Sequence, residues 1–388
     1  MADDAPELVA WRALWERFAA LGEELYGPGY PDAPADRVEG LAHLAEQVVC
    51  WLTWALGHAD PARPTFQRQN DLFTMWGGPN ADNVYRHARV EPGRRYRITG
   101  RMHSCDDFIL AIRAGYMHME RWGTLEQVTA SELGIGPGDD FELLLGSTDE
   151  PGWIPLPEGA VMVSIREYYF EWEAREPAIM TIECLDVGGS PARRTGAALA
   201  GQLAEAGELV EHSIRYWNRY LVDARAERTD NSFAPPLTVA KGLAGARYAY
   251  CFYDLGPDEA LLVDSDLPDA RYWSLQLYTH GWFELVDTAD RMTSLNQVQA
   301  VVGADGRLRV VVAHRDPGVP NWLDTGGRPE ALLMFRWFWP RHEPTPTATV
   351  VPFAELSALL AGEPAVDGME RAEEVRRRRE HLGWRFRV

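Results

Sequence analysis

Two polar stretches combine residue types that can bind a small molecule and move protons. The first, RQNDLFTMWGGPNADNVY, surrounds a glycine pair with amides, carboxylates and aromatic rings. Glycine lets the backbone approach a ligand closely, and Asn and Asp supply oriented hydrogen bonds. The same residue types also build ordinary turns, and that alternative stays open. The candidates in this stretch are Asp71, as a catalytic group, and Trp76, Asn80, Asp82, Asn83 and Tyr85, as substrate-binding groups.

The second stretch, HGWFELVDTADRMTSLNQ, places a histidine a few residues before two aspartates. A histidine beside a carboxylate can act as a general base at neutral pH. We expect His280 to be the base and Asp287 or Asp290 to orient it. The alternative is a strand end followed by a polar connection. Further binding candidates lie in this stretch and in the aromatic strand before it: Trp273, Tyr278, Trp282 and Asn296.

Three histidines, His103, His280 and His314, fall on expected strands and could converge. His103 is a second catalytic candidate and His314 a binding candidate. A strand histidine is more often structural than a metal ligand, so we predict no metal, with a divalent ion as the less favoured alternative. The chain lacks Gly-x-Gly-x-x-Gly after a strand, a Walker-type loop and Gly-x-Ser-x-Gly. These gaps argue against a dinucleotide or flavin cofactor and against a common serine hydrolase.

The composition limits the classes of partner that the protein is expected to bind. The 388 residues carry a net charge of −20, which disfavours nucleic acid and anionic membranes. Fifteen tryptophans suit an apolar or aromatic-faced ligand such as a terpenoid, steroid or polycyclic, and Asn321 and Trp322 lie at a turn that could line its pocket. The four dispersed cysteines read as reduced buried thiols, and the acidic start is not a signal peptide. We therefore expect a cytoplasmic protein, with a homo-oligomer left open.

The apolar pattern changes along the chain and divides it into segments. Helical spacing predicts helices over 5–26, 35–56 and 192–224, and strand-like runs alternate with Gly/Pro turns between and after them. The charged run EEVRRRREH reads as the solvated face of a helix. The expected organisation is an N-terminal helical segment (1–60), a first β-sandwich domain (61–189), a helical linker (190–236), a second β-sandwich domain (237–352) and a C-terminal helix (353–388).

The two β regions resemble each other. Gly152-Trp153 matches Asn321-Trp322, and the apolar run that follows places Arg166 against Arg336. Further upstream, Arg95-Tyr96 matches Arg271-Tyr272, which puts His103 almost in register with His280. We interpret this as an internal duplication: a mainly β fold with flanking helices, built from two tandem β-sandwich, jelly-roll-like units. The two arginines read as clamps on a carboxylate or loop carbonyl, and ligand binding is the alternative.

The second copy resembles a known family. Its motifs are YWSLQLY from Tyr272, Asp305-Gly306, Pro320-Asn321-Trp322-Leu323, and RWFWP from Arg336. Together they are similar to the bacterial family catalogued as domain of unknown function 1214, over about residues 247–352. Asp324-Thr325 stands where the family usually has Pro-Ala, and Phe338 where it has Tyr. The resemblance implies a β-sandwich or jelly-roll-like domain, often preceded by a second β domain, and brings no established activity or catalytic set.

The function expected from these features is a small-molecule enzyme without an organic cofactor. It would act by acid–base chemistry, of lyase, isomerase or hydrolase type, on an apolar or aromatic-faced ligand. One alternative is a non-catalytic protein that binds a small molecule or carbohydrate in the same aromatic pocket. The other is a structural or assembly protein. His280 or Asp287 in the pocket with a perturbed pKa would favour the enzyme, a pocket without such a group would favour the binding protein, and no pocket of useful volume would favour the assembly protein.

Overall fold

The computed structural model describes residues 5–146, 151–174 and 176–387. Contacts between Cα atoms group the chain into two compact units. Unit 1 comprises residues 1–76, 84–168 and 176–220, and unit 2 comprises 77–83, 169–175 and 221–388. Two short segments from the first half of the chain, 77–83 and 169–175, therefore belong to the second unit, and both contribute to the site described below.

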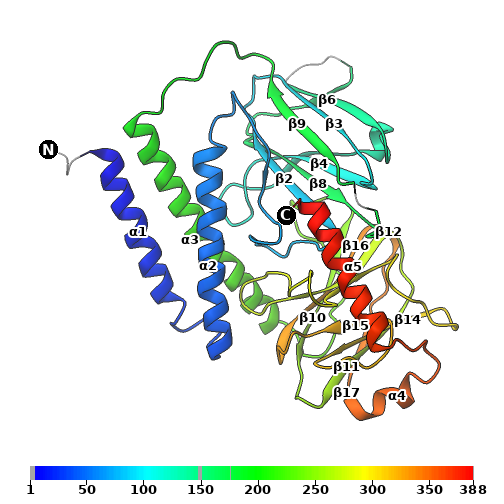
Figure 1. Ribbon diagram of the computed structural model, residues 1–388. Coiled ribbons are helices and arrows are strands. Elements are labelled where there is room, and N and C mark those ends of the chain that lie inside the picture. The colour runs from blue at the N-terminus through cyan, green and yellow to red at the C-terminus, as the bar shows by residue number, and fades with distance from the viewer. Residues whose placement is uncertain (1–4, 147–150, 175, 388) are drawn as a thin grey trace. The chain divides into compact units, whose positions relative to one another are not determined.

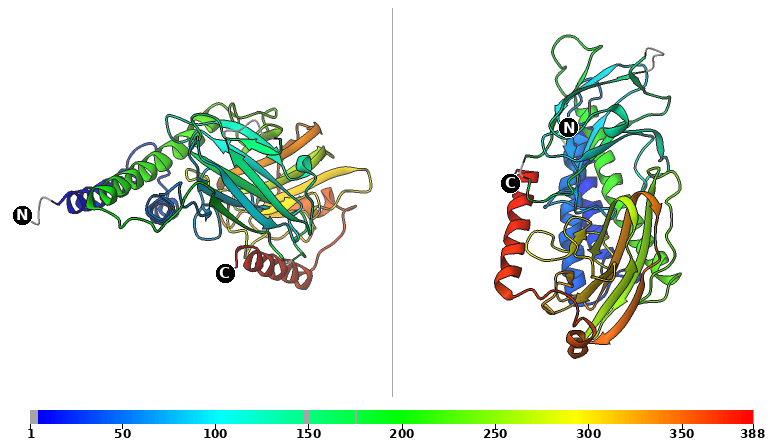
Figure 2. Two further views of the ribbon diagram at one scale, coloured as in Figure 1. Left: turned by 90° about the horizontal axis from the view of Figure 1, so that it is seen from above. Right: turned by 90° about the vertical axis from the view of Figure 1, so that its right-hand side faces the viewer.

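Three helices of unit 1 form where helical spacing predicts them. α1 spans Pro6–Glu24, α2 spans Pro34–Gly57, and α3 begins at Gly196 and ends at Ala226, just beyond the unit (Figure 1). A proline at the first position starts both α1 and α2, because its fixed φ suits a helix and its missing N–H would have no helical partner. The views of Figure 2 also place these three helices together. None of the described helices is long and apolar enough to cross a membrane.

Unit 1 contains two sheets. The first has the strand order β1-β2-β8-β4-β5 and the second the order β7-β6-β3-β9. The pairs β1–β2, β4–β5, β4–β8, β3–β6 and β3–β9 are antiparallel, and β6 pairs with β7 in parallel. The bounds are β1 Gln67–Arg68, β2 Asn83–Arg89, β3 Tyr96–Arg101, β4 Asp107–Arg113, β5 Thr124–Thr129, β6 Asp140–Gly146, β7 Trp153–Pro155, β8 Met162–Tyr168 and β9 Ile179–Cys184. A 3-10 turn, η1, covers Ser131–Leu133.

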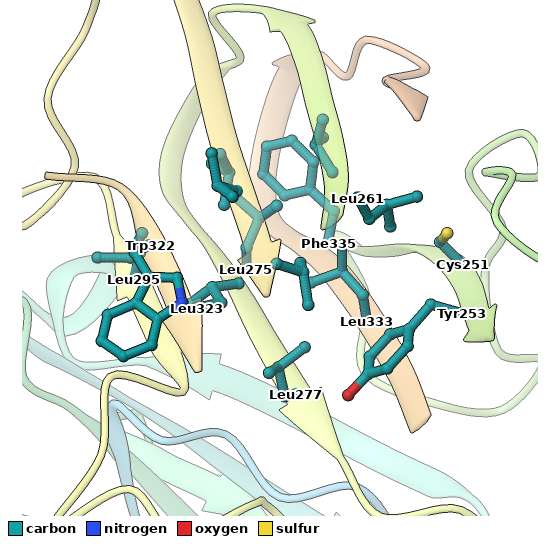
Figure 3. Packing of buried hydrophobic residues seen from close by; sticks show 14 of the residues in the cluster. Cys251, Tyr253, Leu261, Leu275, Leu277, Leu295, Trp322, Leu323, Leu333 and Phe335 are labelled. Carbon is teal, nitrogen blue, oxygen red and sulfur yellow. The ribbon is translucent and has the colours of Figure 1, made fainter. Parts of the chain in front are cut away.

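Unit 2 also contains two sheets, ordered β10-β16-β12-β13 and β15-β14-β11-β17. Apolar side chains from both sheets form one core, including Leu275 and Phe335 from the first and Leu261 and Leu323 from the second (Figure 3). The bounds are β10 Ala246–Asp254, β11 Glu259–Asp266, β12 Asp269–Tyr278, β13 Ser294–Asn296, β14 Arg307–Ala313, β15 Trp322–Asp324, β16 Glu330–His342 and β17 Thr347–Pro352.

The two units repeat one topology, which confirms the mainly β fold and its tandem duplication. Strands β2 to β9 and β10 to β17 occupy corresponding places in the two strand orders. Arg166 lies on β8 and Arg336 on the matching β16. Each guanidinium lies 5.3 Å from the ring of a tyrosine on the matching neighbour strand, Tyr85 in one copy and Tyr248 in the other. The two arginines are therefore equivalent by position and by stacking.

The upstream part of the expected repeat alignment is wrong by one strand. Tyr96 lies on β3, whose topological partner is β11, whereas Tyr272 lies on β12, whose partner is β4. His103 and His280 consequently follow strands that do not correspond. A repeated Arg-Tyr pair gave the false register, because neighbouring strands of one sandwich share the same alternation and sequence spacing alone does not separate them.

The C-terminal segment differs from the single solvated helix expected from 353. It forms η2 (Phe353–Glu355), α4 (Leu356–Leu359) and, after a break, α5 (Gly368–Phe386). Asp367 and Glu370 make a capping box that starts α5. The charged run is not simply a solvated face: Arg371, Arg378 and Arg385 are each 3–6% exposed. Their spacing of seven residues, close to two helical turns, puts them on one side of the helix.

Candidate functional site

Strand β12 of unit 2 is buried on both faces, and only one face is apolar. Trp273, Leu275 and Leu277 point into the sandwich core. The alternate residues point to the opposite face, yet they too are fully buried, at 0% exposure each. These alternate residues are Tyr272, Ser274, Gln276 and Tyr278. Buried polar groups are costly unless hydrogen-bonded, so this face must find partners elsewhere in the unit.

The segment 77–83 supplies the central partner, Asp82, which is 1% exposed. Its Oδ2 lies 2.5 Å from the Tyr272 hydroxyl. Its Oδ1 accepts 2.8 Å hydrogen bonds from the Trp172 indole N–H and from Asn296 Nδ2. The Asn296 amide is held in that orientation because its Oδ1 accepts from the backbone N–H of Val298, 2.9 Å away. Three converging donors satisfy a carboxylate that burial would otherwise destabilise.

A directed chain of hydrogen bonds leads to Asp82. The backbone N–H of Ala81 donates to Gln276 Oε1 at 3.0 Å, which fixes the Gln276 amide. Gln276 Nε2 then donates to Ser274 Oγ at 2.7 Å, and Ser274 Oγ lies 2.8 Å from the Tyr272 hydroxyl. Tyr272 has one proton, and the carboxylate is the strongest acceptor within reach. The chain therefore runs from Gln276 through Ser274 and Tyr272 to Asp82.

Burial, and next the negative charge of Asp82, raise the pKa of Tyr272 well above its ordinary value. The phenol is therefore protonated at neutral pH and donates to Asp82. Asn80 adds a further contact, with Oδ1 2.8 Å from the Tyr272 hydroxyl. The ring of Phe170 stacks on Tyr272 with centroids 5.4 Å apart, which limits how the phenol can tilt. The Tyr272–Asp82 pair is thus a proton donor and acceptor held at fixed geometry.

Arg336 holds the covering segment at the other end of this face. Its Nη1 donates to the Pro79 carbonyl at 3.1 Å and to the Tyr278 hydroxyl at 2.7 Å. The backbone at Gly78 has a φ of +64°, and a Cβ there would lie 2.4 Å from the Phe283 ring. Only glycine fits this close approach without strain. Arg336 thus clamps loop carbonyls, as the sequence suggested.

Helix α5 brings two more cations and a histidine to the same face. The rings of Trp172 and His381 stack at 5.1 Å, and the guanidiniums of Arg378 and Arg385 lie 4.6 and 4.5 Å from the Trp172 ring. His381 Nδ1 faces the Ala174 carbonyl at 3.0 Å, so Nδ1 carries the proton and Nε2 accepts from Arg385 Nε at 2.8 Å. Burial, and then Arg385, lower the pKa of His381 to about 2, which keeps the ring neutral.

Strand β4 of unit 1 occupies the place of β12 in unit 2, so the residues of the two strands can be compared position by position. Ser274 faces Arg336 across β12 and β16, and the matching pair in unit 1 is Ile109 with Arg166. By the same register, Ala111 corresponds to Gln276. Ile109 and Ala111 are almost fully buried too. The sandwich therefore tolerates apolar residues at the positions of Ser274 and Gln276, whereas the residue that matches Tyr272 is Asp107, which is also polar and buried.

Four residues expected in a site meet in this network: Asn80, Asp82, Tyr278 and Asn296. Asn83 lies next to them and donates its backbone N–H to the Asn80 carbonyl at 3.0 Å. The network contains Arg336, which the sequence singled out as a clamp, and residues that were not among the sequence candidates: Trp172, Tyr272, Ser274, Gln276, Arg378, His381 and Arg385. The seven-residue spacing of the buried arginines on α5 is a signal that could have found two of them.

The expected base, His280, lies in the turn that follows β12 and is partly buried, and the two aspartates expected to orient it are engaged elsewhere. Asp287 is exposed and accepts from the backbone N–H groups of Ala289 and Asp290. The Asp290 carboxylate, also exposed, pairs with Arg379 at 2.9 Å. These contacts build a turn and a surface ion pair, so neither carboxylate orients His280.

The remaining unit 2 candidates serve the sandwich. Trp273 and Trp322 belong to the apolar core, and Trp282 is 1% exposed. Asn321 ties a loop to a strand, because its Nδ2 donates to the carbonyls of Val301 and Arg309 at 2.6 and 2.8 Å. His314 Nδ1 lies 2.7 Å from Thr325 Oγ1.

The unit 1 candidates are scattered. Asp71 caps a turn by accepting from the backbone N–H groups of Phe73 and Thr74. His103 lies in the turn after β3, with Nδ1 3.4 Å from a Glu176 oxygen. Tyr85 stacks under Arg166. Trp76 belongs to an aromatic cluster with Trp51, Tyr116 and His118.

The fold and network together define a duplicated β-sandwich protein with a polar site on one sheet of its second unit. Residues 257–342 match the model of the family described as "Protein of unknown function (DUF1214)", which confirms the resemblance seen in the motifs. The matched residues contain β12 and Arg336 but not the segment 77–83 or α5.

The solved structures include a strong similarity. An uncharacterized protein from Burkholderia cenocepacia is 27% identical, covers 89% of this chain and 97% of its own, and superposes with a TM-score of 0.83. A protein from Vibrio parahaemolyticus is 11% identical over 80% of this chain and 98% of its own, with a TM-score of 0.47, too low for any inference. No curated protein matches the chain.

Proposed function

We propose that the protein is a small-molecule enzyme that uses the Tyr272–Asp82 pair for acid–base chemistry without an organic cofactor. One observation carries this proposal: a fully buried, directed polar chain occupies a sheet face where the duplicated copy has Ile109 and Ala111. Buried polar networks are expensive, and titratable groups with perturbed pKa values cluster at functional sites. Binding sites also commonly combine aromatic walls with a few convergent polar groups, as this face does.

The pair can abstract a proton by relay. The Tyr272 oxygen takes a proton from an acidic C–H or O–H group of the substrate while its own proton passes 2.5 Å to Asp82 Oδ2. The substrate is left with the electron pair of the broken bond, Tyr272 stays neutral and Asp82 becomes protonated. This route avoids a tyrosinate beside a carboxylate, which the raised pKa of Tyr272 disfavours. Return of the proton to another substrate atom would complete an isomerisation, and loss of a leaving group a lyase reaction.

The test is a conversion screen with a matched tyrosine control. Purified full-length protein is incubated with terpenoids, steroids, aromatic acids and sugars, and products are followed by mass spectrometry. Tyr272→Phe should lower kcat by about 10²–10⁴-fold, the usual contribution of a positioned acid or base. Tyr253→Phe is the control, because Tyr253 is equally buried in the same unit but belongs to the apolar core. A ligand that binds wild type and is never converted would instead identify a binding protein.

A further inference from the structure

Arg378 is a buried cation whose hydrogen bonds go to neutral acceptors. Its side chain comes from α5 and the residue is 4% exposed. Nε donates to the Thr288 carbonyl at 3.3 Å, Nη1 to the Ser294 carbonyl at 3.0 Å and Nη2 to Ser294 Oγ at 2.7 Å. All three acceptors are neutral. Among the residues that the structure describes, no carboxylate forms a salt bridge with this guanidinium.

Arg371 is also a buried arginine of α5, but it lies outside the site and forms ion pairs. Its Nε lies 2.9 Å from Asp316 and its Nη1 2.5 Å from Glu374, so two carboxylates balance one guanidinium. A buried charge is ordinarily paired in this way, because removing an ion from water is costly unless a partner compensates for the lost hydration. Arg378 departs from that rule within the same helix.

The carboxylates that act on Arg378 do so without direct contact. Burial is the main cause that lowers the pKa of Arg378 to about 10, and the positive charge of Arg385 lowers it further, whereas Asp82, Glu374 and Asp287 raise it. Glu374 forms its ion pair with Arg371, and Asp287 is exposed. An anion in contact with Arg378 would supply the ion pair that its three neutral acceptors do not.

Arg378 lies close to the reacting pair along the sheet. Its partner Ser294 is on β13, directly across from Gln276 of β12. Asn296, two residues further along β13, donates to Asp82. A guanidinium has five N–H groups in a planar fork, and the three hydrogen bonds above leave two of them for a ligand.

We propose that the molecule bound at the Tyr272–Asp82 site carries an oxyanionic group, a carboxylate or phosphate, that Arg378 binds. The inference rests on the proposed function for the position of the site, and it names the substrate class. An anchored oxyanion would hold the rest of the substrate against Tyr272, and the guanidinium of Arg378 would stabilise negative charge that develops as the proton leaves.

Matched probes test this on the full-length protein. Benzoate, cinnamate and cyclohexanecarboxylate are compared with their primary amides, and phenyl phosphate and inorganic phosphate form a separate arm. Binding is measured by calorimetry and thermal shift at constant ionic strength. We expect at least one acid to bind ten-fold or more tightly than its amide. Tighter binding of the phosphate arm than of the carboxylates would assign the oxyanion as a phosphate, and the reverse as a carboxylate.

Variants of neighbouring arginines locate the effect. Arg378→Gln should abolish the preference for the acid, and Arg378→Lys should retain part of it. Arg379→Gln is the control, since Arg379 is exposed on the same helix and pairs with Asp290. Circular dichroism confirms that each variant is folded, and Arg378→Lys serves if Arg378→Gln is not. Equal binding of acids and amides by wild type, or an unchanged preference in a folded Arg378 variant, would overturn the inference.

The two proposals fail separately. Acid preference that depends on Arg378, together with conversion that survives Tyr272→Phe, would keep the oxyanion site and refute the acid–base pair. Conversion that depends on Tyr272 but acts on acids and amides alike would keep the pair and refute the oxyanion site.

Discussion

The Tyr272 hydroxyl lies 2.5 Å from Oδ2 of Asp82, although 190 residues separate the two along the chain. Asp82 comes from a short segment that leaves the first β region and joins unit 2, and Tyr272 from the central part of that unit. The second unit thus takes the carboxylate of this network from a segment that lies between β1 and β2 of the first unit. The family match covers 257–342 and therefore contains half of this pair.

Removing the charge of Asp82 should destabilise unit 2 strongly. Asp82→Asn takes away the carboxylate with the largest effect on the pKa of Arg378, and loss of one partner from a buried charged group typically costs about 3–5 kcal/mol. The free energy of unfolding from urea titration measures this. In the Asp82→Asn background, Arg378→Met should recover about 1 kcal/mol of unfolding free energy, because it removes the buried positive charge that Asp82 no longer balances. Strict additivity of the two changes would contradict the electrostatic account.

Gly78→Ala should loosen the covering segment. A methyl group there would meet the Phe283 ring at 2.4 Å, in addition to the strain of a φ of +64°. Gly93→Ala is a matched control, since Gly93 has a φ of +84° and open space around it. We expect the free energy of unfolding, measured by urea titration, to fall by about 1 kcal/mol for Gly93→Ala and by at least about 2 kcal/mol for Gly78→Ala. Equal costs would show that the close contact with Phe283 does not constrain the segment.

Ser274→Ala should separate catalysis from stability. The hydroxyl contacts Tyr272 at 2.8 Å and Gln276 Nε2 at 2.7 Å, so its loss costs about 1 kcal/mol of stability. The same change frees the Tyr272 oxygen from one of its partners, and kcat should fall about ten-fold while KM stays near the wild-type value. A variant with lowered stability and unchanged kcat would assign Ser274 a purely structural role.

Stability should fall as the pH drops below about 6.5. Burial lowers the pKa values of His87 and His118 to about 3 and that of His381 to about 2. The unfolded chain therefore binds protons that the folded protein does not. Stability from these groups is complete above the unfolded pKa of about 6.5 and is lost toward pH 3, at up to about 1.4 kcal/mol per pH unit for each histidine.

The range from pH 7 to pH 5 isolates the histidines, because most carboxylates titrate lower. Urea midpoints measured across that range give the slope. His118→Phe should flatten it by roughly a third and keep the stack on Tyr116, whose centroid is 5.3 Å away. It should also keep or raise stability at pH 7, because neither ring nitrogen of His118 has a hydrogen-bond partner among the described residues. A slope identical to wild type would contradict the buried, neutral state of His118.

The sequence predicts the helices well where the spacing of apolar residues and the residues at the helix starts agree. The helices α1 and α2 begin and end within one or two residues of the spacing-based expectation, with prolines at their starts. The match of Arg166 with Arg336 is also correct, because a Trp turn and a long apolar strand fix its register. The upstream match fails, since an Arg-Tyr pair recurs on strands that do not correspond.

The site is harder to predict because its polar groups look ordinary in sequence. Tyr272 and Gln276 alternate with core residues as they would on a strand with one wet face, and only the covering segments bury them. Arg378 sits in a charged run that reads as solvated, and its burial depends on Trp172 from a distant segment. The sequence does predict Asn80, Asp82 and Asn296, because clusters of Asn and Asp indicate oriented hydrogen bonds whether or not they bind a ligand.

The most direct test of the central claim compares two buried tyrosines of unit 2. Tyr272→Phe and Tyr253→Phe each remove one hydroxyl, and only Tyr272 touches Asp82. With a substrate from the conversion screen, the account predicts that kcat falls about 10²–10⁴-fold in Tyr272→Phe and stays within about two-fold of wild type in Tyr253→Phe. Full turnover by a folded Tyr272→Phe variant would show that the Tyr272–Asp82 pair does not perform the chemistry.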